Sequence, residues 1–216
     1  MSLWPRTVIG FGALGRLRNR NHHIMVAHSR FANRELLMTK PQDVVVALKL
    51  CLSGADQSFA ALAGELGMSA SEVRGACSRL IAARLLDPET RRPRRKALQE
   101  FLRFGVPHVF PAHLGELTRG IPTAWAAPAM AGMVSADDGA TPIWPDPEGT
   151  RQGAAVEPLY RSVPIAAKND PALYDLLTLV DALRIGRARE RKFAQQELER
   201  RLGQEPVVST RGVSNG

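Results

Sequence analysis

Serine and arginine side chains recur between residues 69 and 78 at a spacing that suits contact with DNA bases. If this stretch is a helix, its apolar residues at 73, 76, 77 and 80 face inward. A step of about 100° per residue then turns positions 71, 74, 75 and 78 outward. Arginine reads guanine through two hydrogen bonds in the major groove, and serine can bond to several base edges. The pattern predicts a base-reading surface made by Ser69, Ser71, Arg74 and Ser78.

A dense run of positive charge follows this stretch. Five of the six residues from Arg91 to Lys96 are basic. Such side chains neutralise backbone phosphates, which strengthens DNA binding without reading sequence. We therefore expect phosphate contacts from Arg91, Arg92, Arg94 and Arg95. The alternatives are a solvated loop or a nuclear-type targeting address.

Upstream of the arginine run, a set of three residues has the spacing of a helix-turn-helix unit. A small residue where two helices cross is followed four residues later by glycine and six residues after that by a branched apolar residue. These positions read Ala63, Gly67 and Val73. Glycine tolerates the left-handed conformation that ends a helix, and Ser69-x-x-Glu72 is a capping box that starts the next one. The alternative is a helical hairpin in some all-α core.

The elements expected before and after this motif follow the order helix, helix, helix, short strand and turn. Helical periodicity runs from Asp43 to Leu52 and again from Phe59 to Leu66, before the third helix. A short strand is predicted at Leu85 and Leu86, then a turn over residues 87–89 and a helix over residues 96–103.

With this order of elements, residues 59–69 (FAALAGELGMS) and 73–86 resemble winged helix-turn-helix transcriptional regulators, broadly the MarR-like superfamily. The resemblance spans residues 42–104. It implies that Ser69 to Ser78 read bases and that the wing grips phosphate. The chain departs from that pattern, because it lacks helical dimerisation segments on both sides and inserts a long proline-rich region.

The rest of the chain divides by composition. Residues 1–37 hold six arginines and one acid, Glu35, and we interpret them as a basic flexible arm. Alternatively, Met38 is the true start and the arm is not translated. Residues 105–169 form a Pro/Gly-rich middle module, with extended stretches expected at 106–110 and 121–127. Trp125 and Trp144 belong either to its core or to a small-molecule pocket.

A long C-terminal helix is expected over residues 170–203. Asp170-Pro171 is a specific helix start, and the helix is expected to continue past Gly186 to Leu202. An apolar stripe from Leu173 to Leu183 packs either on its own chain or on a second subunit, which would make this segment a dimerisation element. Residues 204–216 are expected to be a disordered tail.

Composition sets further limits. A net charge of +8 and a pI near 10.3 favour a polyanionic partner. Two isolated cysteines exclude a disulfide framework and a CxxC site, which favours a reducing cytoplasm. No apolar run is long enough to span a membrane, and no secretory signal pattern is present.

Other motifs lack the context that their chemistry requires. Gly10-x-Gly12-x-x-Gly15 matches a dinucleotide-binding string but is not followed by a helix that could pack on a sheet. The five histidines have no zinc-site spacing, and the adjacent acids Asp137 and Asp138 point apart. We therefore expect no enzyme, no metal and no cofactor.

The sequence predicts a mainly α protein, with a winged helix-turn-helix domain followed by a Pro-rich module and a long C-terminal helix. Its expected function is sequence-specific binding of duplex DNA as a transcriptional regulator, a repressor or autoregulator that acts as a homodimer. The alternative is an antitoxin-type protein-interaction module, whose middle and C-terminal segments bind a partner protein.

Overall fold

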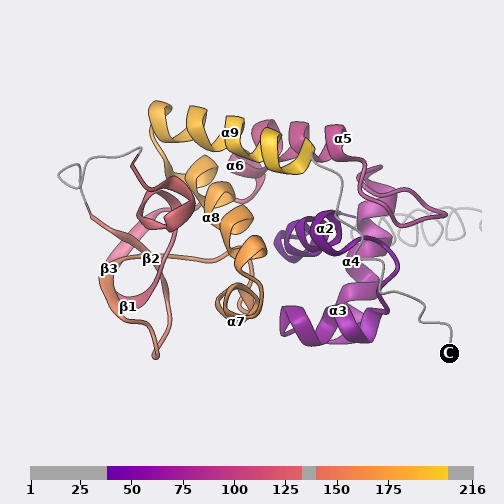
Figure 1. Cartoon of the computed structure of the whole chain (residues 1–216), viewed down its shortest axis with the longest axis horizontal. Helices are drawn as coiled ribbons and strands as arrows, with labels where there is room; N and C mark the ends of the chain where they lie inside the picture. Colours follow the sequence, from indigo (N-terminus) through magenta and orange to yellow (C-terminus); the bar gives the residue numbers. More distant parts are fainter. Residues whose placement is uncertain (1–37, 133–139, 204–216) are drawn as a thin grey trace, which may run out of the picture. The chain divides into compact units, whose positions relative to one another are not determined.

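The computed structural model describes residues 38–132 and 140–203, and these are mainly helical with one small sheet (Figure 1). Expectations for residues 1–37 and 204–216, for the glycine-rich string and for Asp137 and Asp138 lie outside the described residues. Among the described helices, none is long and apolar enough to cross a membrane.

The predicted N-terminal helices are confirmed as α2 (Pro41–Ser53), α3 (Phe59–Leu66) and α4 (Ala70–Ala82). Ser58 caps α3 by accepting a hydrogen bond from the Ala61 N–H. Gly67 ends α3 in the left-handed conformation, with φ 62°. Helix α4 packs on both α2 and α3, so these three helices form one layered unit.

The next segment is helical where an extended stretch was expected. Helix α5 (Arg95–Glu100) continues through the π-turn η1 (Phe101–Gly105) into α6 (Val106–Val109). The expectation of extended structure at 106–110 was therefore wrong. In a regular α-helix the ring of Pro107 would clash with the carbonyl of Arg103, and the wider π-turn just before the proline accommodates that ring.

A small closed sheet follows, which the sequence did not predict. Strand β1 (Leu114–Pro122) pairs antiparallel with both β2 (Pro142–Pro145) and β3 (Arg151–Val156). Strands β2 and β3 pair in parallel, which closes the sheet. The extended stretch expected at 121–127 is only partly correct, since β1 ends at Pro122 and Ala124–Ala126 form the 3₁₀ turn η2. A second 3₁₀ turn, η3, covers Pro128–Met130.

The expected long C-terminal helix is two helices. Before them lies α7 (Val163–Asn169), after which α8 (Pro171–Ile185) starts at the predicted Asp170 cap and α9 follows over Ala188–Gly203. The helix is interrupted at Gly186, whose backbone is extended. A Cβ there would lie 2.3 Å from the Ala182 carbonyl oxygen, so only glycine allows α9 to fold back on α8.

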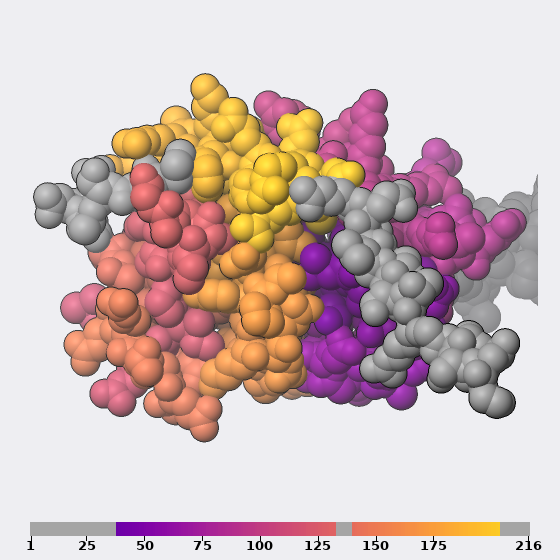
Figure 2. Space-filling view, viewed as in Figure 1, coloured from indigo at the N-terminus to yellow at the C-terminus, as the bar shows by residue number. Residues whose placement is uncertain are grey.

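Helix α8 lies at the centre of the described fold. It packs against α2, α6, α7 and α9, and the orange surface of α7 and α8 meets the violet surface of α3 without a break (Figure 2). Its apolar stripe is buried in the chain's own core and comprises Leu173, Leu176, Leu177, Leu179, Val180 and Leu183. This stripe is therefore not a free surface for a second subunit.

A buried ion pair fixes α8 to the middle segment. The Arg184 guanidinium lies 2.6 Å from the Asp181 carboxylate, and their side chains are 4% and 1% exposed. Thr123 and Trp144 also donate to Asp181, at 2.9 and 2.5 Å. Burial raises the pKa of the Asp181 carboxyl, and the Arg184 charge opposes that shift. Arg184 donates in addition to the carbonyls of Phe110 and Glu157, so this pair joins four other segments to α8.

Replacing Arg184 with methionine should strongly destabilise the protein. The change leaves the buried Asp181 charge without its cation, which costs about 3–5 kcal/mol in unfolding free energy. Urea denaturation measures this loss. Arg200→Met is the control, because Arg200 pairs with Glu197 at the surface with its side chain 58% exposed, and should cost at most about 1 kcal/mol. Similar losses for both variants would contradict a structural role for the buried pair.

Candidate nucleic-acid interface

In the described part of the chain, no other segment covers the outward face of α4. Ser71, Arg74 and Ser78 are exposed, as the sequence predicts, while Val73, Ala76, Cys77 and Leu80 are buried. With Ala70 and Gly75 they line a shallow hollow on the protein surface. The small side chains leave room for another molecule to approach the helix backbone.

Arg74 is the main hydrogen-bond donor on this face. Its guanidinium lies 5.4 Å from the centre of the Phe59 ring, at the start of α3. This cation–π contact orients the side chain and leaves its N–H groups available. The Ser78 hydroxyl donates to the Arg74 carbonyl at 3.1 Å, so the oxygen of Ser78 remains an acceptor.

The first turn of α4 is fixed by the predicted capping box. Ser69 Oγ accepts the Glu72 N–H, and the Ser69 N–H donates to Glu72 Oε2 at 2.7 Å. The Tyr160 hydroxyl donates to the same carboxylate. Hydrogen bonds from Tyr160 and then from Ser69 lower the pKa of Glu72 to about 2, so Glu72 is charged at neutral pH.

A buried ion pair that the sequence did not reveal sets the position of α4. The Arg79 guanidinium donates to both oxygens of Asp43, at 2.8 and 2.5 Å, and Asp43 is fully buried at the start of α2. Asp43 also accepts the Lys40 N–H. Bidentate geometry fixes orientation as well as distance, so this pair holds α4 at a defined angle to α2.

A second buried cation joins three helices. Lys49, on the inward face of α2, pairs with Glu65 of α3 and with Asp170, the cap of α8. Asp170 at the same time accepts the Ala172 and Leu173 N–H groups. Lys49 of α2 therefore links α3 to the start of the central helix.

A short hairpin follows α4. Leu86 and Pro93 form an isolated β-bridge where the sequence predicted a strand, and the predicted turn lies between them. Asp87 Oδ1 accepts the N–H groups of Glu89 and Thr90 and the Thr90 hydroxyl, which holds the turn. The hairpin is much shorter than a regular two-stranded wing.

The four arginines predicted to contact phosphate fall into two pairs. Arg91 donates to the Ala55 carbonyl at 2.7 Å and covers the Phe59 ring, and Arg95 donates to the carbonyls of Cys51 and Leu202. The guanidinium groups of these two residues bind carbonyls within the fold, and their predicted phosphate contacts stay a prediction. Arg92 and Arg94 are exposed, and Arg94 has only a 3.9 Å contact with Asp87.

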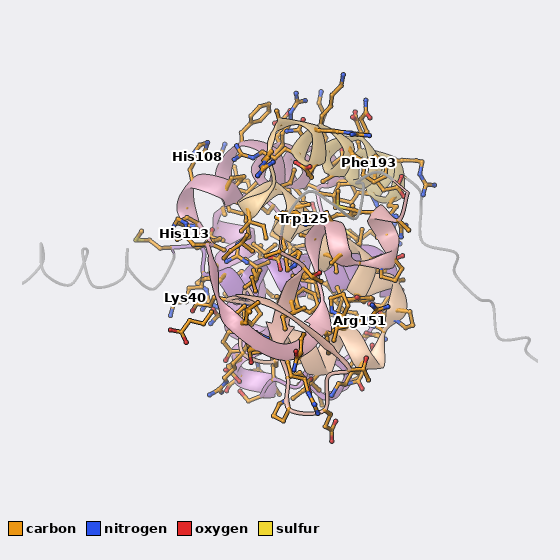
Figure 3. All side chains as sticks on the ribbon, turned by 90° about the vertical axis from the view of Figure 1, so that its left-hand side faces the viewer. Lys40, His108, His113, Trp125, Arg151 and Phe193 are labelled. Atoms are coloured by element: carbon orange, nitrogen blue, oxygen red, sulfur yellow. The ribbon has the colours of Figure 1, made fainter. Side chains whose placement is uncertain are left out.

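Among the remaining candidate residues that the structure describes, none forms a comparable site. Trp144 is buried in the core, whereas Trp125 is half-buried. His108 and His113 are exposed, on the left-hand side of the molecule in Figure 3. Burial raises the pKa of the Cys51 thiol to about 12. In residues 38–132 and 140–203, no group of three or more potential metal ligands is present.

Comparisons with protein-family models, with curated proteins and with solved structures find no match to this chain.

Two neighbouring arginines at the start of α5 should differ in their effect on stability. Arg95→Ala removes charged hydrogen bonds that cap the last turns of α2 and α9, each worth about 1.5–3 kcal/mol. Arg94→Ala removes an exposed side chain and should change the unfolding free energy by about 0.5 kcal/mol or less. Thermal or urea denaturation of both variants measures the difference. Equal stabilities would show that the Arg95 contacts contribute nothing.

Proposed function

We propose that the chain is a sequence-specific duplex DNA-binding protein that regulates transcription. The observation that carries this proposal is the outward face of α4, which is exposed, small, polar and basic on a helix whose buried face is firmly held. A major groove accepts an α-helix of this kind. The charge of +8 favours the same class of partner.

The proposed domain is a winged helix-turn-helix formed by α2, α3, α4 and the hairpin. Three features support it. Ala63 is buried where α3 packs on α4, Gly67 makes the left-handed turn, and Val73 anchors α4 in the core. In this arrangement α4 is the recognition helix, and the hairpin corresponds to the wing.

The two groups of exposed side chains have different roles in this proposal. Arg74, with Ser71 and Ser78, contacts base edges, and Ser69 contacts the backbone or a base at the start of the helix. Arg92 and Arg94 contact phosphates beside the groove. Arg91 and Arg95 support the hairpin from within the fold.

The regulatory role that we propose is repression or autoregulation of transcription in the cytoplasm. The proposed regulator acts as a homodimer and has no catalytic activity. Two-fold symmetric operators are matched by dimers of helix-turn-helix proteins. Since the stripe of α8 is buried in the chain's own core, a dimer has to use another surface.

A second candidate function is a protein-interaction module of the antitoxin type. Large apolar side chains are exposed along the segment from η1 to β1. These are Phe104, Val109, Leu114 and Leu117, which are 44–81% exposed. Contiguous exposed apolar surface is typical of protein-binding sites. If the chain is such a protein-interaction module, its contact with DNA is incidental.

A gel shift with the chain's own promoter region and competitor DNA separates the two candidates. The regulator should prefer the promoter fragment over random duplex. Arg74→Ala should then cost roughly 1–3 kcal/mol in binding free energy on the specific fragment and leave random-duplex binding almost unchanged.

Arg119→Ala, at an exposed arginine of β1, is the matched control and should bind as wild type. If wild type does not prefer the promoter, the interaction module is favoured. If Arg74→Ala weakens specific and random binding equally, Arg74 does not read bases.

A further inference from the structure

A loop that precedes α7 reaches the first turn of α4. The Tyr160 hydroxyl donates to Glu72 Oε1, and Arg161 Nη2 lies 3.6 Å from the same oxygen. Glu72 is the third residue of α4, so both side chains lie next to the start of the proposed recognition helix. They come from a part of the chain 88 residues further along.

Further contacts hold this loop and α7 in place. A Cβ on Gly67 would lie 3.3 Å from side-chain atoms of Ser162 and Ile165, so the turn between α3 and α4 packs closely on the start of α7. At the other end of α7, the Asn169 amide donates to the Glu65 carbonyl at 3.0 Å, at the end of α3. Helix α7 therefore packs against α3, and the backbone of Arg161, just before α7, is held near the start of α4.

The charge of Arg161 is available to a ligand. Its side chain is 80% exposed and stacks on the Tyr160 ring at 5.5 Å. The Glu72 carboxylate already accepts hydrogen bonds from Ser69 and Tyr160. At 3.6 Å, Arg161 forms an ion pair with Glu72 without a hydrogen bond, so its exposed N–H donors can turn to an incoming anion.

The geometry of α4 indicates which anion this is. At about 100° per residue, Glu72 and Arg74 lie on opposite borders of the outward face. Phe59 lies on the Arg74 border, and Tyr160 and Arg161 lie on the Glu72 border. A DNA strand beside a helix in the major groove presents its phosphates along such a border. Arg161 also offsets the repulsion between those phosphates and Glu72.

We propose that Arg161 contacts a backbone phosphate beside the first turn of α4, on the opposite border from Arg74. This inference rests on the proposed function and extends it to a residue outside the helix-turn-helix segment. The DNA-binding surface then includes the loop before α7, and Tyr160 is a positioning residue that holds the loop against Glu72.

The salt dependence of binding tests the proposal. Affinity of the full chain for a labelled promoter duplex is measured by fluorescence anisotropy over a series of KCl concentrations. Each phosphate contact contributes about 0.9 to the slope of log affinity against log salt. Arg161→Ala should lower the slope by about 0.9, which at 0.1 M salt is about an eightfold loss, on promoter and random duplex alike.

Three further variants define the outcome. Arg161→Lys should keep the slope, because a lysine also neutralises phosphate, and Arg119→Ala should not change it. The double variant Arg92→Ala/Arg94→Ala is the reference for lost phosphate contacts and should lower the slope by about 1.8. Thermal melts confirm that each variant is folded.

The possible failures are distinguishable. If wild type binds the promoter selectively, an unchanged slope for Arg161→Ala overturns the proposal about Arg161 alone, whatever slope the Arg92→Ala/Arg94→Ala variant gives. If wild type does not bind duplex DNA selectively, the proposed function and this inference fall together.

Discussion

The buried Asp181–Arg184 pair is the contact on which the rest of the described fold depends. Two charges withdrawn from water are tolerated only when their remaining hydrogen-bonding groups are satisfied. Here that requirement draws Thr123, Trp144 and two backbone carbonyls onto one turn of α8. The pair therefore fixes the middle segment, with its proline-rich loops and small sheet, to the central helix.

The same central helix supports the candidate DNA-binding surface. The cap of α8, Asp170, pairs with Lys49 of α2, and Lys49 pairs in turn with Glu65 of α3. Arg79 and Asp43 then fix α4 on α2. Because Lys49, Asp43 and Arg79 are largely buried and the Arg79–Asp43 contact is bidentate, α4 is held in a defined orientation with its polar face outward. Residues outside α3 and α4 thus determine how α4 is presented.

Local signals in the sequence predicted where several helices start and end. Contacts between residues far apart in the chain could not be predicted. The Ser69–Glu72 box, Gly67 and the Asp170 cap act within a few residues, and each was identified correctly. The inward orientation of Arg91 and Arg95 depends on carbonyls between 34 and 107 residues away, which no local pattern reveals. For the same reason the sequence did not indicate Arg161, whose neighbour Glu72 is distant in the chain.

The central claim is that α4 enters the major groove, and protection of guanine N7 from methylation tests it most directly. Guanine N7 faces only the major groove, where Arg74 is proposed to reach a base. On a bound promoter fragment, we expect a short cluster of protected guanines, at least one of which becomes reactive again in Arg74→Ala. Saturated binding with every guanine N7 still reactive would contradict it.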